Sequence, residues 1–330
     1  MKLLIIRFSS IGDIILTSPV ARIAKNQINA EVHFITKEQY ASLLKSNPYI
    51  DKVYTIKSDV REIINDLKKE KYDYIIDLHN SLRSKILKFL LKTKSFSFKK
   101  ENIKKWLMVN FKVKSEILHI TERYINTLEK FKVKNDNEGL DFFYQDNPNL
   151  FKTFDIPESY VCISLGAKHF TKKIPIEIIK KIISNLNYNF VLIGGYDVTA
   201  TANAITKDNP DNIIDLTGKI SIYESAQIID NSLFLISSDT GMMHIGAALK
   251  KEMIVLWGNT VPGFGMDPYY GNKKIMYFNS EVNNLSCRPC SKIGFDNCPK
   301  KHFKCMKNQN IDNIVNFSQK IIKHNIISGN

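Results

Sequence analysis

Short apolar runs alternate with segments of helical spacing along this chain, and the alternation predicts an α/β protein built on parallel sheets. Apolar, β-rich runs at 2–8, 31–36, 52–56 and 160–166 are predicted strands. The most compact example extends from Leu233 to Gly258, as a strand, the turn SDTG, a helical segment and a second strand. That stretch is one βαβ unit, and we expect the rest of the chain to be organised around it.

Two halves of the chain repeat the same opening of strand, glycine turn and helix. A polar, proline-containing connection separates them, and YVCISLG at 160–166 begins the pattern again. A chain of 330 residues also suits two domains of about 150 residues each. We therefore predict Rossmann-like domains at 1–150 and 151–330, with the amphipathic segment 311–327 packing across both.

The SDTG turn predicts a phosphate site. Ser238 or Asp239 can cap the following helix, while the N–H groups of Thr240, Gly241 and Met242 would have no intrahelical partners and suit a diphosphate. Asp239 would be repelled by phosphate, so it either caps the helix or accepts hydroxyl hydrogen bonds from a sugar. His244, one helical turn further, faces either the ligand or the core.

The first half offers two further corners at predicted strand ends. Asp13, in the turn SSIGD, is either a helix cap or a general base. His79, Asn80 and Arg83 follow the predicted strand YDYIIDL, where ligands bind in open α/β sheets. His79 is a candidate second base and Arg83 a partner for an acidic acceptor, although both could be structural.

The second half opens with basic residues in a similar corner. A lysine just outside a strand–turn–helix corner can neutralise a departing diphosphate, and Asp197, after a Gly-Gly turn, could bind a ribose hydroxyl. No strand is followed by a Walker or dinucleotide fingerprint. The basic residues of this corner are Lys168, His169, Lys172 and Lys173.

Several of these segments together resemble the lipopolysaccharide heptosyltransferases of glycosyltransferase family 9. The likeness rests on RFSSIGDIILTSPV, DLHNSLRS, GAKHFTKKIP, SDTGMMHIGAAL and the CRPC tail. It implies a GT-B fold, with two facing Rossmann-like domains and a cleft between them. Leu165 and Ile174 depart from the Pro and Trp that family members often have near the lysine corner.

The resemblance also implies a reaction: inverting, metal-independent transfer of a heptose from ADP-heptose to a lipid-linked core acceptor, without a cofactor. Asp13 would be the base, and Lys172 would take the place of the family's phosphate-binding lysine. Donor binding would fall to Lys168, Asp197, Ile220, Asp239, Thr240, Gly241, Met242 and His244. Acceptor binding would fall to Ser10, Gly12, His79, Asn80 and Arg83.

The net charge and its distribution indicate an anionic binding partner. The formal net charge is +14, and residues 83–114 carry eleven lysines or arginines against the single acid Glu101, interleaved with Trp106 and other apolar residues. Such a segment suits an anionic glycan or the inner leaflet of a membrane, although a lysine-rich solvated face is the alternative. No apolar run is long enough to span a membrane, and Arg7 interrupts the first apolar run too early for a signal peptide. We therefore expect a cytoplasmic protein, peripheral at the membrane.

The cysteines near the end of the chain leave two readings open. Cys287, Cys290, Cys298 and Cys305 could hold a structural zinc ion or remain reduced thiols. Two other classes compete with the transferase: a nicotinamide-dependent oxidoreductase, which would need a dinucleotide fingerprint, and a basic nucleic-acid-binding protein. A family 9 relative with another nucleotide-sugar or acceptor is the nearest alternative.

Overall fold

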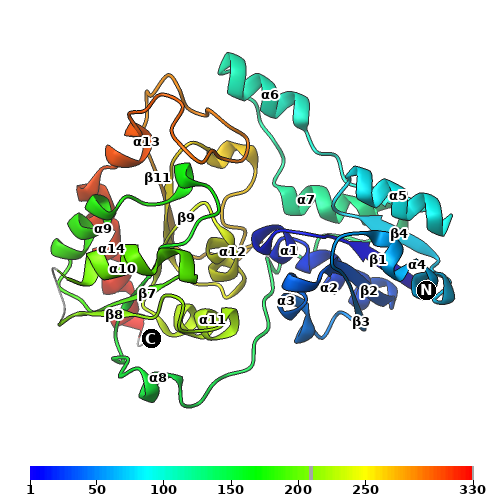
Figure 1. Cartoon of the computed structure of the whole chain (residues 1–330), viewed down its shortest axis with the longest axis horizontal. Coiled ribbons are helices and arrows are strands. Elements are labelled where there is room, and N and C mark those ends of the chain that lie inside the picture. The colour runs from blue at the N-terminus through cyan, green and yellow to red at the C-terminus, as the bar shows by residue number, and fades with distance from the viewer. Residues whose placement is uncertain (208–210, 329–330) are drawn as a thin grey trace. The chain divides into compact units, whose positions relative to one another are not determined.

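The chain divides into two compact units, each built on a parallel sheet (Figure 1). The computed structural model describes residues 1–207 and 211–328. Unit 1 consists of Met1–Glu101, Leu118–Phe143 and Tyr269–Lys273. Unit 2 consists of Asn102–Ile117, Tyr144–Pro268 and Lys274–Asn330.

Unit 1 holds a five-stranded sheet in the order β3-β2-β1-β4-β5, with every neighbouring pair parallel. The order changes direction between β1 and β4, and ligands in open α/β sheets bind outside the carboxyl ends of the strands at such a switch point. Leu4, Ile6 and Phe8 from the central strand and the loop after it lie in the core. The strands are β1 (Lys2–Ile6), β2 (Glu31–Lys37), β3 (Lys52–Ile56), β4 (Tyr74–Asp77) and β5 (Ser95–Ser97).

Helices connect these strands, as parallel pairing requires. Asp13 lies in α1, and Arg83 lies in the first turn of α5. The helices are α1 (Ile11–Ile15), α2 (Ser18–Ile28), α3 (Ser42–Lys45), α4 (Ile64–Lys69), α5 (Leu82–Leu91) and α7 (Ile120–Ile125), with 3₁₀ turns η1 (Glu38–Tyr40), η2 (Val60–Ile63) and η3 (Asn126–Phe131).

Unit 2 repeats the topology with one strand more, in the order β11-β10-β9-β6-β7-β8, again all parallel. Its switch point lies between β6 and β9, which end at Ser164 and Ser238. The strands are β6 (Val161–Ser164), β7 (Phe190–Ile193), β8 (Ile213–Asp215), β9 (Leu235–Ser238), β10 (Met253–Trp257) and β11 (Tyr277–Glu281).

The helices of unit 2 follow the same βα alternation. Ile314, Ile321 and Ile322 of the last helix, α14, lie in the core of unit 2, and its expected packing on the other domain stays a prediction. The helices are α6 (Asn102–Phe111), α8 (Leu150–Thr153), α9 (Ile176–Ser184), α10 (Thr199–Thr206), α11 (Ile222–Asn231), α12 (Gly241–Ala248), α13 (Lys304–Lys307) and α14 (Ile311–Ser328), with 3₁₀ turns η4 (Phe170–Lys172), η5 (Tyr196–Val198) and η6 (Pro262–Phe264).

Two short segments belong to the other unit than expected for uninterrupted domains at 1–150 and 151–330. The main change of unit falls between Phe143 and Tyr144, but residues 102–117 join unit 2 and residues 269–273 join unit 1. Apolar packing explains the first exchange, because Met108 and Ile117 form a small core with Phe264. The second segment is tied to unit 1 by Lys273, which pairs with Glu138 at 2.9 Å.

Candidate functional site

A chain of polar contacts lies at the carboxyl edge of the second sheet. Lys172, at the end of η4, places its Nζ 2.6 Å from Oδ2 of Asp239, the residue after β9. The Thr260 hydroxyl, beyond the end of β10, donates to the same oxygen at 2.7 Å. Asp239 and Thr260 are buried, whereas Lys172 keeps 18% of its side chain exposed. An ammonium group is thus held by buried partners while part of it remains open to a ligand.

The helix that follows Asp239 begins without a side-chain cap. Thr240 is the N-cap of α12, with an extended backbone and no capping hydrogen bond from its side chain. The expectation that Ser238 or Asp239 caps this helix is therefore wrong, because Asp239 is engaged by Lys172 and Thr260 instead. The first N–H groups of α12 remain available to an anion, beside the ammonium of Lys172.

The Lys172 turn is fixed by the cysteine-rich loop. The Thr171 N–H donates to the Phe295 carbonyl at 3.1 Å, and the Phe295 N–H donates to the Thr171 hydroxyl at 2.8 Å. Gly258 passes so close that a Cβ there would meet the Thr171 carbonyl oxygen at 2.4 Å. Only glycine allows the loop after β10 to approach this turn, which brings Thr260 within reach of Asp239.

Arg288, in the same cysteine-rich loop, holds the loop after β10 from the other side. Its guanidinium donates to the Gly258 carbonyl at 2.7 Å and to the Thr260 carbonyl at 2.8 Å. It also pairs with Glu281 at 2.9 Å, and its side chain is only 7% exposed. Sequence reasoning missed this residue, because a lone arginine in a cysteine-rich loop gives no signal of what it contacts.

The other predicted donor residues occupy the same edge with different environments. Lys168 is exposed, and Asp197 is exposed and pairs with Lys173 at 3.3 Å. Ile220 is half-buried in the loop after β8, whereas His244 is buried in α12. The structure thus puts Lys168, Asp197 and Ile220 in the loops that follow β6, β7 and β8.

Two buried polar side chains at this edge have no hydrogen-bond partner. They are the Ser164 hydroxyl, at the end of β6, and both amide atoms of Asn259, next to Thr260. Buried polar groups are nearly always satisfied, so each such group calls for an explanation. Both lie where a ligand of an open α/β sheet would bind, and neither was singled out from the sequence.

In unit 1, the carboxyl end of β1 holds Asp13 in place. One carboxylate oxygen of Asp13 pairs with the buried Arg7 guanidinium at 2.8 Å. The other accepts from the Ser10 hydroxyl at 3.0 Å and the Ser10 N–H at 3.2 Å. Gly12 is buried beside them in α1. Both readings of Asp13 therefore stay open, because this partly exposed carboxylate stabilises the start of α1 and is also fixed by an arginine.

His79, Asn80 and Arg83 surround the next strand end. The His79 ring meets the buried Phe8 ring edge-on at 5.1 Å, and the Arg83 guanidinium lies 5.7 Å from the centre of the same Phe8 ring. Burial, with the charges of Arg7 and Lys100, lowers the pKa of His79 to about 4. With this pKa the ring is neutral at pH 7, and its buried Nδ1 has no hydrogen-bond partner. Asn80 instead donates to the Phe98 carbonyl at 3.0 Å, which is a structural contact.

Two residues that the sequence reasoning did not place in the site also belong to this corner. The fully buried carboxylate of Asp77 accepts from the N–H groups of His79 and Asn80 at 3.1 and 2.7 Å, and pairs with Lys88 at 2.8 Å. It fixes the turn that carries both side chains. Burial lowers the pKa of Lys100, and the nearby charges of Arg7 and Lys85 lower it further.

The described residues contain one group of three potential metal ligands within 4.8 Å of one another, namely Glu31, His33 and Glu70. Lysines already neutralise it, because Glu70 pairs with Lys2 at 2.8 Å and with Lys52 at 2.7 Å. A cation is therefore disfavoured there.

The cysteines of the predicted zinc site do not form such a group, although Cys287 Sγ lies 3.9 Å from His302 Nε2. All are free thiols, and burial raises the pKa of Cys290, as do its neighbours Cys287 and Cys298. Reduced thiols and a structural zinc ion stay alternatives for these cysteines.

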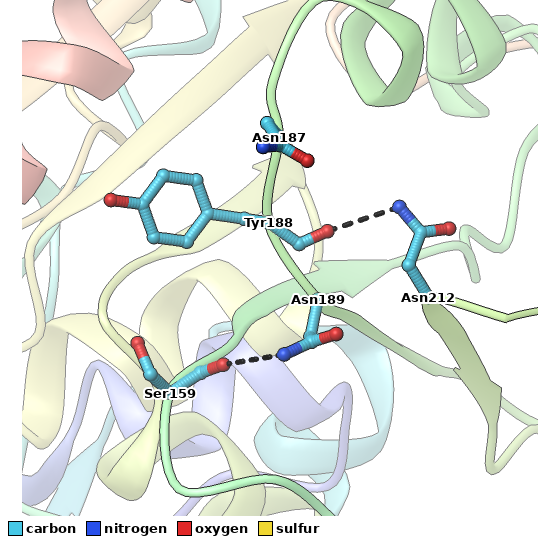
Figure 2. Close-up of a pocket in the computed structure, with 5 residues that line it drawn as sticks. All are labelled: Ser159, Asn187, Tyr188, Asn189 and Asn212. Carbon is cyan, nitrogen blue, oxygen red and sulfur yellow. Dashed lines mark hydrogen bonds between the residues drawn. The ribbon is translucent and has the colours of Figure 1, made fainter.

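A shallow pocket lies at the opposite edge of the second sheet, near the amino ends of β6, β7 and β8 (Figure 2). Its lining amides are largely satisfied locally: Asn189 donates to the Ser159 carbonyl at 3.3 Å and Asn212 to the Tyr188 carbonyl at 3.1 Å. Ligands of parallel α/β sheets bind at the carboxyl ends instead. The geometry therefore favours the Lys172–Asp239 corner over this pocket.

Comparison with known proteins identifies the enzyme class. The sequence profile of glycosyltransferase family 9 (heptosyltransferase) matches residues 60–294, more than half of the chain. The chain belongs to glycosyltransferase family 9. It is thus an enzyme of heptosyl transfer, and the oxidoreductase and nucleic-acid-binding interpretations of the sequence are wrong.

Family 9 proteins match the chain over almost its whole length. Lipopolysaccharide heptosyltransferase 1 of Campylobacter coli is 24% identical over 324 residues, which cover 86% of this chain and 89% of that protein. A family 9 glycosyltransferase from Veillonella parvula superposes with a TM-score of 0.78 at 18% identity, covering 98% of this chain and 97% of its own. The E. coli heptosyltransferase WaaC with ADP gives 0.68 at 18% identity, covering 97% and 100%.

These structures confirm the GT-B fold class for this family 9 member. Within the described residues, no helix of the protein is both long and apolar enough to pass through a bilayer.

Proposed function

We propose that this family 9 enzyme transfers a heptose from ADP-heptose to a lipid-linked acceptor of the lipopolysaccharide core. The observation that carries the proposal is the Lys172–Asp239–Thr260 chain beside the uncapped start of α12. It supplies an ammonium and oriented N–H groups for a diphosphate, with a carboxylate next to them for sugar hydroxyls. The ADP in the structure of E. coli WaaC supports the choice of nucleotide.

In the proposed reaction, Asp13 takes the proton from the acceptor hydroxyl as its oxygen attacks the anomeric carbon of the donor. The bond from that carbon to the diphosphate breaks in the same step, and ADP leaves with the electron pair. Lys172 and the N–H groups of Thr240, Gly241 and Met242 stabilise the charge that develops on the diphosphate. A single displacement inverts the anomeric centre, and the ammonium group supplies the positive charge that a metal ion supplies in other transferases.

Other side chains of unit 2 would make the remaining contacts with the donor. Asp239 would hold the heptose, Asp197 a ribose hydroxyl, and Ile220 the edge of the adenine, with Lys168 near the diphosphate. Buried His244 would support the start of α12 from below. Ser164 and Asn259, whose polar atoms lack partners, extend this list.

Side chains of unit 1 would bind the acceptor. Arg83 and Lys100 suit its acidic groups, and Ser10 and Gly12 shape the corner at Asp13. Neutral His79, with its pKa lowered to about 4, would accept a hydrogen bond from a hydroxyl. We further propose that the enzyme works in the cytoplasm, at the inner membrane, where a lipid-linked acceptor would be presented.

The first test is thermal stabilisation of the purified protein by ADP, UDP, GDP, CMP and NADH, because a ligand that binds only the folded state raises the midpoint. We expect a selective shift with ADP, reduced in Lys172→Ala. Lys181→Ala, an exposed lysine in the last turn of α9 with no assigned role in the site, is the matched control for lost charge. A selective shift with UDP or GDP would refute ADP-heptose as donor.

Turnover then tests the chemistry. With ADP-heptose and a core acceptor, Asp13→Asn should lower kcat by about 10²-fold or more, while ADP stabilisation is unchanged. Near-normal turnover in Asp13→Asn would refute its role as base. Activity that disappears with EDTA and returns with Mg²⁺ would refute the metal-independent mechanism.

A further inference from the structure

Helix α6 is attached to unit 2 by one face. Buried Lys105 and Met108 point toward Phe264, with the Lys105 Nζ 5.6 Å from the centre of the Phe264 ring, and Met108 shares a small core with Phe264 and Ile117. Just beyond the helix, the Lys112 Nζ donates to the Pro289 carbonyl at 2.7 Å. The helix is therefore held on its unit rather than loosely tethered.

The opposite face of α6 and the residues after it are apolar and exposed. Ile103 is 77% exposed, Trp106 50%, Phe111 63% and Val113 48%. The Trp106 and Phe111 rings pack edge-to-face with their centres 5.3 Å apart, so they form one patch. Single exposed apolar residues are common on protein surfaces, but four within eleven positions, two of them aromatic, mark a surface that binds something apolar.

Positive charge surrounds this patch. Lys104, Lys112 and Lys114 are exposed among its residues, and the nearest acids in the sequence, Glu101 and Glu116, lie outside the range 103–114. A protein interface between two copies of this patch would bring lysines against lysines in a chain of net charge +14. An anionic bilayer satisfies both properties, because its headgroups attract lysine while its interface accepts tryptophan and aliphatic side chains.

We propose that Ile103, Trp106, Phe111 and Val113, here called the α6 face, insert into the interface of an anionic membrane, with the three lysines at the phosphate level. The purpose of this contact rests on the proposed lipid-linked acceptor, which lies in such a membrane. Since α6 belongs to the unit that carries the Lys172–Asp239 corner, the membrane holds the donor-binding unit directly.

The chain contains its own reporter of insertion. It has two tryptophans, and Trp257 is 1% exposed, so changes in tryptophan emission report on Trp106. Phosphatidylcholine vesicles with a one-third share of phosphatidylglycerol should shift the emission to shorter wavelength and protect it from acrylamide quenching. Neutral phosphatidylcholine vesicles should bind about 100-fold more weakly, since each lysine near an anionic surface contributes about fivefold.

Variants distinguish binding by the α6 face from nonspecific adsorption of the protein to vesicles. Ile103→Ser with Phe111→Ser, which leaves Trp106 as reporter, should weaken vesicle binding by about tenfold or more, since about two apolar side chains leave the interface. Tyr277→Ser, which removes a partly exposed aromatic from the edge strand β11 of the same unit, should bind as the unaltered protein does. Circular dichroism melts check that each variant folds.

Three results would overturn the proposal: no emission change with anionic vesicles, equal binding to neutral and anionic vesicles, or an emission shift that follows protein concentration without vesicles. The last would assign the α6 face to a second copy of the chain. These vesicles contain no glycan acceptor and the measurement needs no turnover. Failure here with an intact ADP shift would refute the membrane contact alone, whereas binding here without an ADP shift would refute the proposed donor alone.

Discussion

Charge pairing between Lys172 and Asp239 should depend on whether the donor site is filled. The perturbation is a double-mutant cycle of Lys172→Met, Asp239→Asn and both changes together, measured by urea unfolding with and without ADP. Asparagine keeps an oxygen that accepts from Thr260, so the cycle removes the charge while preserving the neighbouring hydrogen bond. The coupling energy then reports the ion pair.

The size of the coupling follows from the geometry. At 2.6 Å and an effective dielectric constant of about 20, two unit charges attract by about 6 kcal/mol. Removing both groups from water offsets most of this attraction, and Lys172 keeps 18% of its side chain exposed. We expect a net coupling of about 1–3 kcal/mol in the free protein, between the values of exposed and fully buried pairs.

Saturating ADP should reduce this coupling to less than half, because the diphosphate then becomes the principal partner of Lys172. Asp239→Asn alone should bind ADP at least as tightly as the unaltered protein, since its carboxylate no longer competes for the ammonium. A coupling that ADP leaves unchanged would refute the assignment of Lys172 to the diphosphate. A coupling below about 0.5 kcal/mol without ADP would refute the ion pair itself, being within the error of such cycles.

Three further predictions test the supports of the two corners. Gly258→Ala forces a Cβ against the Thr171 carbonyl. It should weaken ADP binding about tenfold or more, measured by calorimetry, and lower the free energy of unfolding in urea by about 1–3 kcal/mol. Unchanged ADP binding would contradict this account of the turn. Arg288→Ala should raise the KM for the donor more than it lowers kcat. Arg288→Lys should recover only part of the loss, because lysine cannot contact both carbonyls at once. A full recovery in Arg288→Lys would show that the positive charge alone suffices. The pKa of His79 is about 4 in the folded protein, below the value of about 6.5 in the unfolded chain. As pH decreases from about 6.5 to 4, the unfolded chain therefore binds the proton first, and the stability of the folded protein falls. The loss should be about 1–2 kcal/mol after allowance for partial exposure, and His79→Gln should remove this part of the pH dependence of urea unfolding; an identical dependence in the variant would contradict it.

The sequence predicted the central strands because apolar, β-branched runs bounded by turns are strong local signals. It gave no such signal for β5 (Ser95–Ser97) and β11 (Tyr277–Glu281), which are edge strands. These two edge strands are short or polar, and such residues have the composition of a loop, whereas the edge strand β3 was predicted because its apolar, β-rich residues are a clear signal. The exchange of residues 102–117 was also not predictable, since it depends on contact between Met108 and Phe264, which are far apart in the chain.

The candidate site was predictable as a set of corners but not as a set of contacts. Turn chemistry located Asp13 and Asp239, because helix starts after strands have a recognisable pattern, whereas the family resemblance singled out Lys172 among the basic residues of its corner. It could not show that Asp239 turns away from the helix that it precedes, since the competing charge on Lys172 comes from a distant strand–turn corner. The supporting role of Arg288 is hidden from sequence for the same reason.

The exchange of short segments between the units restricts how this chain can be recombined with another family 9 enzyme. Residues 144–268 carry the Lys172–Asp239 corner, but Phe264 and Val261 are covered by α6 from the N-terminal half of the chain. A fragment that begins at Tyr144 would therefore leave an apolar surface open to water beside the loop that carries Thr260. A chimaera that takes its donor half from another family member should bring that protein's equivalent of residues 102–117 with it, so that the donor corner and the helix that covers its loop come from one sequence.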